Sequence, residues 1–339
     1  MHTRSSVLDE HPTVKAFHAR PALPAVSQPL DAAWLRALCL EAGAGDVGFV
    51  ELERAALAEE RPHIERIFPP TRSLISFALR MNRDDVRSPA RSLANVEFHH
   101  TGDEVNDVAR RITAALERAG IRALNPPMGF PMEADRWMTE RMWMVAHKPV
   151  AVAAGLGHMG IHRNVIHPRF GNFILLGTIL VAAEISAYSR ELDYNPCLEC
   201  KLCVAACPVG AIGGDGVFNF SACYTHNYRE FMGGFADWVE NIADSRDGLD
   251  YRRRVKESES VSMWQSLGFG PNYKSAYCMA VCPAGEDVIA PYLASKKDFT
   301  DEVVRPLQAR REPVYVVRGS DAEAHVQKRY PHKTVRHVR

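Results

Sequence analysis

Hydrophobic positions recur with a helical period in the segment TGDEVNDVARRITAALERAG, residues 101–120. One side of this predicted helix is apolar and consists of Val105, Val108, Ile112 and Leu116. Thr101 and Glu104 have the spacing of a capping box at its start, and Gly120 predicts its end. The segment is therefore the clearest helix that the pattern predicts.

Shorter apolar runs on both sides of this helix predict strands. They are DVGFVEL at 46–52, the central part of FPPTRSLISFALRMN at 68–82, and IRAL at 121–124. DAAWLRALCLEAGAG at 31–45 predicts another helix, which ends at glycine. Helices and strands alternate, so the first half is predicted to form an α/β layer domain.

Residues 148–185 combine a glycine-rich turn with two apolar runs. Gly155, Gly157 and Gly160 have the G-x-G-x-x-G spacing of a dinucleotide site, but the acidic residue about 20 positions later is absent. Glycine allows close backbone approach to a large flat group, and it equally suits a tight turn. A nucleotide site, another large ligand and a purely structural turn all remain open at this point.

The cysteines are concentrated in one part of the chain. NPCLECKLCVAACPVGAI, residues 195–212, has the C-x2-C-x2-C-x3-C-P spacing that holds a cubic iron–sulfur cluster, with Cys197, Cys200, Cys203 and Cys207. Zinc sites usually pair two cysteines and then leave a longer gap. Disulfide frameworks are typical of small secreted chains. Cys39 lies apart within a predicted helix, where packing is the expected role.

Three further cysteines, Cys223, Cys278 and Cys282, follow this motif. In two-cluster ferredoxins the last cysteine of each motif ligates the other cluster. This crossed scheme predicts a first set of Cys197, Cys200, Cys203 and Cys282, and a second set of Cys207, Cys223 and Cys278. A regular second motif would have cysteine at 275, where this chain has Ser275. Either Ser275 ligates as an alkoxide, another side chain or water serves, or the second cluster lacks one iron.

Composition excludes some partners. The 339 residues contain 41 Lys and Arg and 41 Asp and Glu, so no global field attracts nucleic acid or a membrane surface. No apolar run approaches the ~20 residues of a membrane span. The N-terminus has no secretory or twin-arginine pattern, which predicts a cytoplasmic protein. The basic end, HVQKRYPHKTVRHVR, is predicted to be a solvated tail, with a nucleic-acid or phosphate contact as the alternative.

Several motifs in order resemble one family. KPVAVAAGLGHMG, RFGNFILLGTI, the cysteine motif and EFHHTGDEVNDVARRITAALERAGIRAL together resemble the cobalamin-dependent reductases, which comprise reductive dehalogenases and epoxyqueuosine reductases. The likeness covers roughly residues 30–290, and the glycine motif is closer to the dehalogenases.

The resemblance implies an α+β fold. It consists of a flexible arm (1–28), an α/β corrinoid-binding domain with nitroreductase-like layers (29–189), and a ferredoxin-like two-cluster domain (190–290). A helical insertion (229–272) interrupts the two-cluster domain, and a C-terminal extension (291–339) follows it.

The same resemblance implies an oxidoreductase that cleaves a small organic substrate reductively, with no nucleic acid expected. A ferredoxin- or flavodoxin-type donor would supply single electrons through two 4Fe-4S clusters, the second with a non-cysteine ligand or only three irons, to base-off cobalamin. Axial ligation by His158 or His162 is the rival scheme. The implied cobalamin contacts are Gly155, Leu156, Gly157, His158, Met159, Gly160, His162, Arg169, Phe170, Gly171 and Asn172.

The proton donor does not follow from the motifs. Epoxyqueuosine reductases have an acidic residue shortly before the glycine loop, where this chain has Arg141 with Glu140 beside it. The predicted donors are Glu140, Tyr224 and His147, and His99 and His100 are further candidates. Two other functions remain open: tRNA modification of the epoxyqueuosine reductase type, and a non-catalytic electron-transfer protein or corrinoid carrier.

Overall fold

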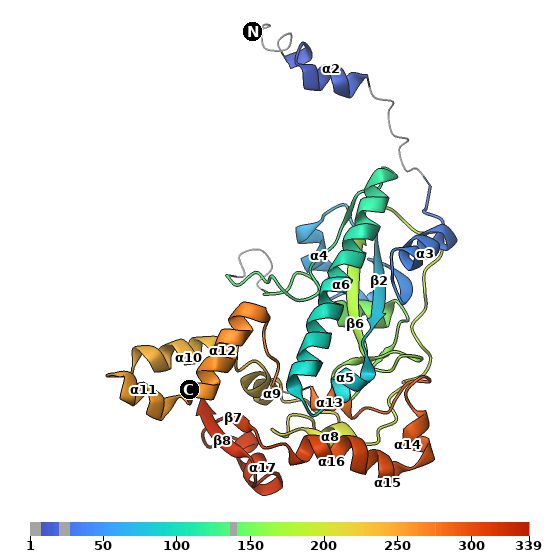
Figure 1. The fold of residues 1–339 in the computed structure, drawn as a ribbon. Helices are drawn as coiled ribbons and strands as arrows, with labels where there is room; N and C mark the ends of the chain where they lie inside the picture. Colours follow the sequence, from blue (N-terminus) through green and yellow to red (C-terminus); the bar gives the residue numbers. More distant parts are fainter. Residues whose placement is uncertain (1–7, 20–27, 136–140, 275, 339) are drawn as a thin grey trace.

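A four-stranded sheet with the order β1-β2-β6-β3 forms the centre of the computed structural model, which describes residues 8–19, 28–135, 141–274 and 276–338 (Figure 1). The strands are β1 (Asp46–Glu51), β2 (Ser73–Arg80), β3 (Ala123–Leu124) and β6 (Ile174–Val181). Each of the three pairings is antiparallel. Antiparallel pairing places the domain in the α+β class, so the predicted fold class is confirmed.

Helices cover both faces of this sheet. The long helix α6 (Arg91–Arg118) packs on one face, and α7 (His147–Ala153) packs on the other (Figure 1). β6 is therefore buried along its whole length, and β2 is buried at every residue before Arg80. A strand that is covered on both faces has a continuous apolar sequence, which explains the uninterrupted runs around β2 and β6.

Helix α6 begins earlier than its sequence pattern predicts. It starts at Arg91, so Thr101 lies inside the helix, is buried, and donates its hydroxyl to Glu97 at 3.0 Å. The predicted capping box at Thr101 is therefore wrong. The predicted apolar stripe is confirmed, because all four of its residues are buried. Gly120 follows the end of the helix with φ +78°, as a C-terminal glycine should.

The two cysteine-bearing segments lie next to each other. α8 (Leu202–Ala206) packs against α13 (Tyr277–Ala280), which also contacts α5 (Arg83–Arg87) beside the sheet (Figure 1). The segment between them is helical, as predicted, and forms a lobe to one side of the sheet. Its helices are α9 (Phe220–Asn227), α10 (Gly233–Ala243), α11 (Gly248–Arg254) and α12 (Glu257–Phe269).

The basic C-terminus is folded. β8 (Thr334–Val338) pairs in parallel with β7 (Pro313–Val317), and α17 (Asp321–Arg329) connects them. Val326, Tyr330 and Lys333 are buried. The prediction of a solvated tail is therefore wrong, because long-range packing buries these residues. Before β7 come α14 (Ala290–Ala294), α15 (Lys296–Phe299), the π-helix η2 (Thr300–Val304) and α16 (Arg305–Ala309).

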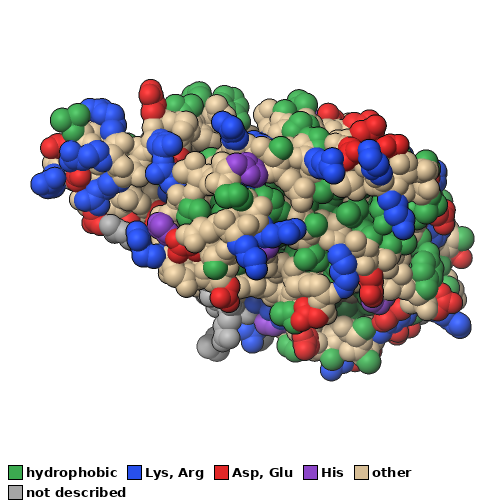
Figure 2. All heavy atoms as spheres, turned by 90° about the horizontal axis from the view of Figure 1, so that it is seen from below, with side chains coloured by type: hydrophobic (Ala, Val, Ile, Leu, Met, Phe, Trp, Pro, Cys, Tyr) green, Lys and Arg blue, Asp and Glu red, His purple; other side chains and the backbone are tan. Residues whose placement is uncertain are grey.

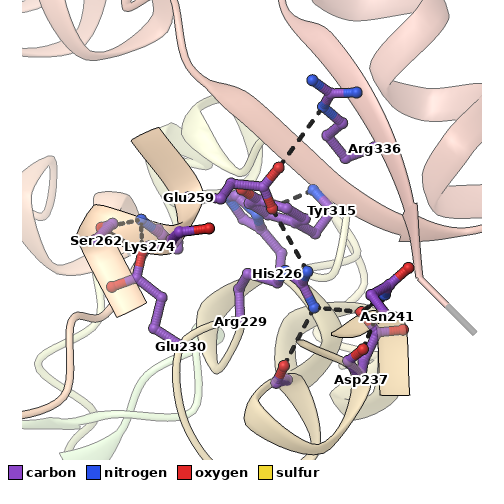
Figure 3. Close-up of polar contacts among 12 residues, drawn as sticks. His226, Arg229, Glu230, Asp237, Asn241, Glu259, Ser262, Lys274, Tyr315 and Arg336 are labelled. Atoms are coloured by element: carbon purple, nitrogen blue, oxygen red, sulfur yellow. Dashed lines mark hydrogen bonds and ion pairs between the residues drawn. The ribbon is translucent and has the colours of Figure 1, made fainter. Parts of the chain in front are cut away.

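A buried polar network joins the helical lobe to this C-terminal pair of strands (Figure 3). Arg229 lies between Asp237 (2.5 Å) and Glu259 (3.4 Å), and its guanidinium stacks 4.9 Å above the ring of Tyr315 in β7. Arg336 of β8 lies 4.0 Å from Glu259. The lobe and the C-terminal strands therefore share their counter-charges.

One apolar core extends through the predicted domains. It includes Leu30, residues of β1, β2, β6 and α6, then Cys203, Val281 and finally Tyr330. The α/β layer, the cysteine segments and the C-terminal extension therefore bury their side chains together. Within the described ranges, no helix is long and apolar enough to cross a membrane. The remaining elements are α2 (Pro12–His18), α3 (Ala32–Glu41), η1 (Ala55–Leu57), α4 (Arg61–Ile67), β4 (His158–Met159) and β5 (Val165–Ile166).

Candidate iron–sulfur site

The predicted first set of cysteines surrounds one small cavity. Its lining includes all four members of the set, Cys197, Cys200, Cys203 and Cys282, together with Ile161 and His162. The loop of the first three contains Glu199 and Lys201 in left-handed conformations (φ 49° and 61°), which curl the backbone before α8. Cys282 reaches the same cavity from the segment after α13, as crossed ligation requires.

The predicted second set also comes together. Burial, followed by the nearby Cys278 and Cys207, raises the pKa of the Cys223 thiol to about 12. Burial and then Cys207 raise the pKa of Cys278 to about 11. Charge effects weaken with distance, and all three cysteines lie in or against the same apolar core. Ser275, the predicted fourth position, lies outside the described residues.

The chemistry of both sets suits clusters. Burial is the first cause of a raised pKa for Cys282, to about 12, so its free thiol is protonated at neutral pH. Iron binding replaces that proton, because the thiolate is the ligand. Each thiolate of a cubic cluster binds a different iron, so the sulfurs lie apart at separate corners. Among the described residues, no group of three or more His, Cys, Asp or Glu is arranged for a single metal ion.

The predicted cobalamin-binding glycines contact the protein itself. A Cβ on Gly155, which has φ +73°, would lie 2.2 Å from the carbonyl oxygen of Arg190. A Cβ on Gly157 would lie 2.5 Å from the carbonyl oxygen of Ile166. These glycines are therefore required by the packing of the loop, so their spacing has a structural cause that is independent of any ligand.

The turn predicted to contact cobalamin, Arg169–Asn172, binds the loop after Cys282. Gly171 has φ +65°, and a Cβ there would lie 2.1 Å from the carbonyl oxygen of Ala284. The N–H of Asp287 donates to the carbonyl of Arg169 at 3.0 Å, and the two side chains pair at 3.1 Å. The turn thereby positions the segment that contains Cys282. Phe170 stacks on His167, with ring centroids 4.6 Å apart.

The two candidate axial histidines differ in their surroundings. His162 is buried, and burial, followed by the charge of Lys148, lowers its pKa to about 4. Its Nδ1 accepts the N–H of Asn164 at 3.1 Å, and its Nε2 pairs with Asn172 at 3.1 Å. Both nitrogens are thus engaged. His158 is half-buried, with Nδ1 3.4 Å from the carbonyl oxygen of Met159. Leu156 is buried and Met159 packs against the same small apolar cluster.

The candidate proton donors are mostly held in structural contacts. His147 pairs with Thr178 (2.9 Å) and the carbonyl of Pro127 (3.1 Å), and burial lowers its pKa, so it is neutral. The hydroxyl of Tyr224 accepts the N–H of Gly233 at 3.0 Å and keeps its own proton to donate. Glu140 lies outside the described residues.

Other candidates are occupied or exposed. Arg141, at the position of the family's acidic donor, lies 2.9 Å from both carboxylate oxygens of the buried Glu60. His99 contacts the carbonyl of Pro271 at 3.0 Å, and His100 is exposed.

Two residues near the second set were not predicted. Lys148 donates to the carbonyl of Arg163 (2.8 Å) and to Asn164 (3.0 Å). Its positive charge lowers the pKa of the Cys278 and Cys223 thiols, against the larger effect of burial. The pKa of Tyr228 is raised to about 12, by burial and then by Cys223. Both had a signal in the sequence: Lys148 opens the glycine motif, and Tyr228 is one helical turn after Tyr224.

Residues 191–213 match a protein-family model described as a 4Fe-4S binding domain, which supports a 4Fe-4S cluster in this segment. Curated proteins similar to the chain include the epoxyqueuosine reductase of Gloeobacter violaceus, 27% identical over 189 residues, or 56% of this chain and 55% of the relative. The epoxyqueuosine reductase of Listeria monocytogenes is 28% identical over 212 residues, or 59% of this chain and 51% of the relative. The chain spans about half the length of these relatives.

A solved structure of epoxyqueuosine reductase with an epoxyqueuosine-modified tRNA stem loop aligns with a TM-score of 0.46 and 14% identity, over 88% of this chain and 83% of that chain.

The chain therefore has an α+β fold and a segment similar to 4Fe-4S binding domains. It is related to the epoxyqueuosine reductases, which confirms the resemblance to the cobalamin-dependent reductases. These curated relatives are named epoxyqueuosine reductases, whereas the glycine motif of this chain resembles that of the reductive dehalogenases. Their names agree with the predicted oxidoreductase class.

Proposed function

We propose that the chain is a cobalamin-dependent reductase of the epoxyqueuosine reductase type, supplied with single electrons by two iron–sulfur clusters. The observation that carries this proposal is the convergence of two cysteine sets beside the glycine loop. Cys203 of the first set is affected electrostatically by Cys278 of the second and by Cys282 of its own. Helix α8, which contains Cys203, packs against α13, which contains Cys278, and this packing supports electron transfer between the two sets.

Cobalamin in this proposal is supported by the motif resemblance and the related reductases. When bound, it would supply the reducing metal centre. The chain's own residues would exclude water and provide a proton, for which Tyr224 and Tyr228 are the best placed beside the second set.

The first experiment is anaerobic reconstitution with iron, sulfide and cobalamin, followed by desalting and assay with epoxyqueuosine-containing tRNA and a low-potential reductant. We expect two paramagnetic cluster signals, retained cobalt and loss of the epoxide. Retained cobalt without turnover would favour the carrier function. Two clusters without cobalt would overturn the cobalamin part of the proposal.

The proposal includes an RNA substrate, which was the alternative function, in place of the expectation that no nucleic acid takes part. The relatives are named for a modified nucleoside, and the helical lobe has suitable side chains. Figure 2 shows Lys and Arg side chains gathered at the end where Figure 1 places α11. This helix exposes Arg252, Arg253 and Arg254, of which the last two pair with Asp250 at 3.3 and 3.2 Å.

The same lobe exposes aromatic rings. Trp264 and Phe269 of α12 are 62% and 75% exposed. Arginines bind phosphates and aromatic rings stack on unpaired bases, which is the usual combination in single-stranded RNA recognition. A neutral total charge does not oppose this, because charge acts locally at salt concentrations where the Debye length is about 8 Å.

We expect the double variant Arg252→Ala/Arg253→Ala to bind tRNA more weakly than the parent. Loss of phosphate contacts should also reduce the slope of log affinity against log salt, by about 0.7–0.9 per contact. Filter binding at several salt concentrations measures both. The matched control is Lys296→Ala/Lys297→Ala on α15, which removes the same charge elsewhere. Equal losses in both variants would contradict an RNA surface on the lobe.

A further inference from the structure

A group of buried and half-buried cations lies beside Cys278. Arg310 and Lys333 of the C-terminal extension share the carboxylate of Glu312, each at 3.3 Å. Arg91, the first residue of α6, lies 4.6 Å above the ring of Tyr277, and Lys333 lies 5.9 Å from the same ring. Tyr277 immediately precedes Cys278. We call Arg91, Arg310 and Lys333 the cation group.

The cation group has more positive charge than Glu312 neutralises. Burial lowers the pKa of Arg91 to about 10, and burial together with Arg91 lowers that of Arg310 to about 10. Both therefore stay charged at neutral pH. Buried charge without a partner costs several kcal/mol, so a further anion should lie nearby.

Buried donors in this region lack partners among the described residues. They are Nε and Nη2 of Arg91, Nη1 of Arg310 and the hydroxyl of Tyr277. Buried polar atoms in native proteins are nearly always hydrogen-bonded, and contact with a bound ion is one common explanation for an exception. These donors come from three parts of the chain, and an anionic neighbour would satisfy them.

The second cluster is the anion that fits. Cys278 belongs to its predicted ligand set, and this thiol acts electrostatically on Arg91. A cluster held by three thiolates is negatively charged, and it gains another negative charge on reduction. Neighbouring cations and hydrogen-bond donors therefore stabilise its reduced form most and raise its reduction potential.

A second arginine offers an internal control. Arg87 is the equivalent neighbour of the first set: it contacts the carbonyls of Ala280 (3.1 Å) and Cys282 (3.5 Å), and the Cys282 thiol acts on it electrostatically. Unlike Arg91, it has no buried donor without a partner. Each cysteine set thus has its own arginine.

We propose that the cation group is the counter-charge of the second cluster and raises that cluster's reduction potential, which makes the C-terminal extension a functional part of the redox centre. The inference rests on the two-cluster proposal above. Arg91 is assigned as a positioning residue for the second cluster. Its contacts are with the segment of Cys278, so the potential of the first cluster should not depend on it.

The test is a redox titration of the full chain, followed by paramagnetic resonance of each cluster. In Arg91→Gln we expect the ratio of reduced to oxidised second cluster, at the parent's midpoint, to fall at least tenfold, which is about 59 mV for one electron. The first cluster should be unchanged. Arg87→Gln should show the opposite selectivity.

If Arg91→Gln loses iron, Lys333→Gln and Arg310→Gln replace it in the test. Each of them should also lower the reduction potential of the second cluster. An unchanged second midpoint in the iron-loaded variants, or equal shifts of both clusters, would overturn this inference alone. A parent protein whose iron content and spectra show only one cluster would overturn the two-cluster proposal, and this inference with it.

Discussion

Replacement of Cys282 by alanine should remove the first cluster and leave the second. Cys282 lines the same cavity as Cys197, Cys200 and Cys203, although it comes from the segment next to Cys278. We expect the variant to lose about half of the bound iron, since each cubic cluster holds a similar number of irons. Iron analysis and the resonance spectrum of the reduced protein measure the loss.

Cys39→Ala is the matched control for this substitution. Cys39 is fully buried in the apolar core and belongs to neither set. It should keep the iron content of the parent. Crossed ligation would be refuted if Cys282→Ala removed the second signal and kept the first.

Arg229→Ala should strongly destabilise the helical lobe. The Arg229 side chain is only 6% exposed, and it is the cation between Asp237 and Glu259 (Figure 3). Its removal leaves these carboxylates in place without that cation, and it also removes the group stacked on Tyr315. Breaking a buried pair in this way typically costs about 3–5 kcal/mol.

Denaturant unfolding followed by circular dichroism measures this cost. The control is Arg253→Ala, whose side chain is 65% exposed and pairs with Asp250 at 3.3 Å. An exposed ion pair contributes about 0–1 kcal/mol, so its loss should hardly change the unfolding midpoint. A loss below about 1 kcal/mol in Arg229→Ala would show that the network does not stabilise the lobe.

Local sequence patterns predicted the parts of the fold that depend on near neighbours. The apolar runs of β1, β2 and β6 and the stripe of α6 follow from periodicity, and the cysteine spacing predicted the two sets. The start of α6 was missed because Thr101 and Glu104 have capping spacing, and only tertiary packing shows that Thr101 is interior.

Contacts between distant segments explain the other differences. The C-terminus reads as a basic tail, yet Lys333 pairs with Glu312 and Arg336 lies near Glu259 of α12. Glycine spacing likewise indicates where the backbone lies close to another group, which is either a ligand or another part of the chain. It does not show that Gly157 approaches Ile166 of the same chain.

The contact between the Arg169–Asn172 turn and the loop after Cys282 has a consequence for biosynthesis. The turn belongs to the α/β layer, whereas Cys282 emerges from the ribosome long after Cys203. During translation, therefore, the first three cysteines of the set are exposed before their fourth partner exists. The proposed ligand set of the first cluster is complete only after the later half of the chain docks on the earlier half. Iron bound at the first set would thus distinguish fully synthesised and folded molecules from incomplete ones.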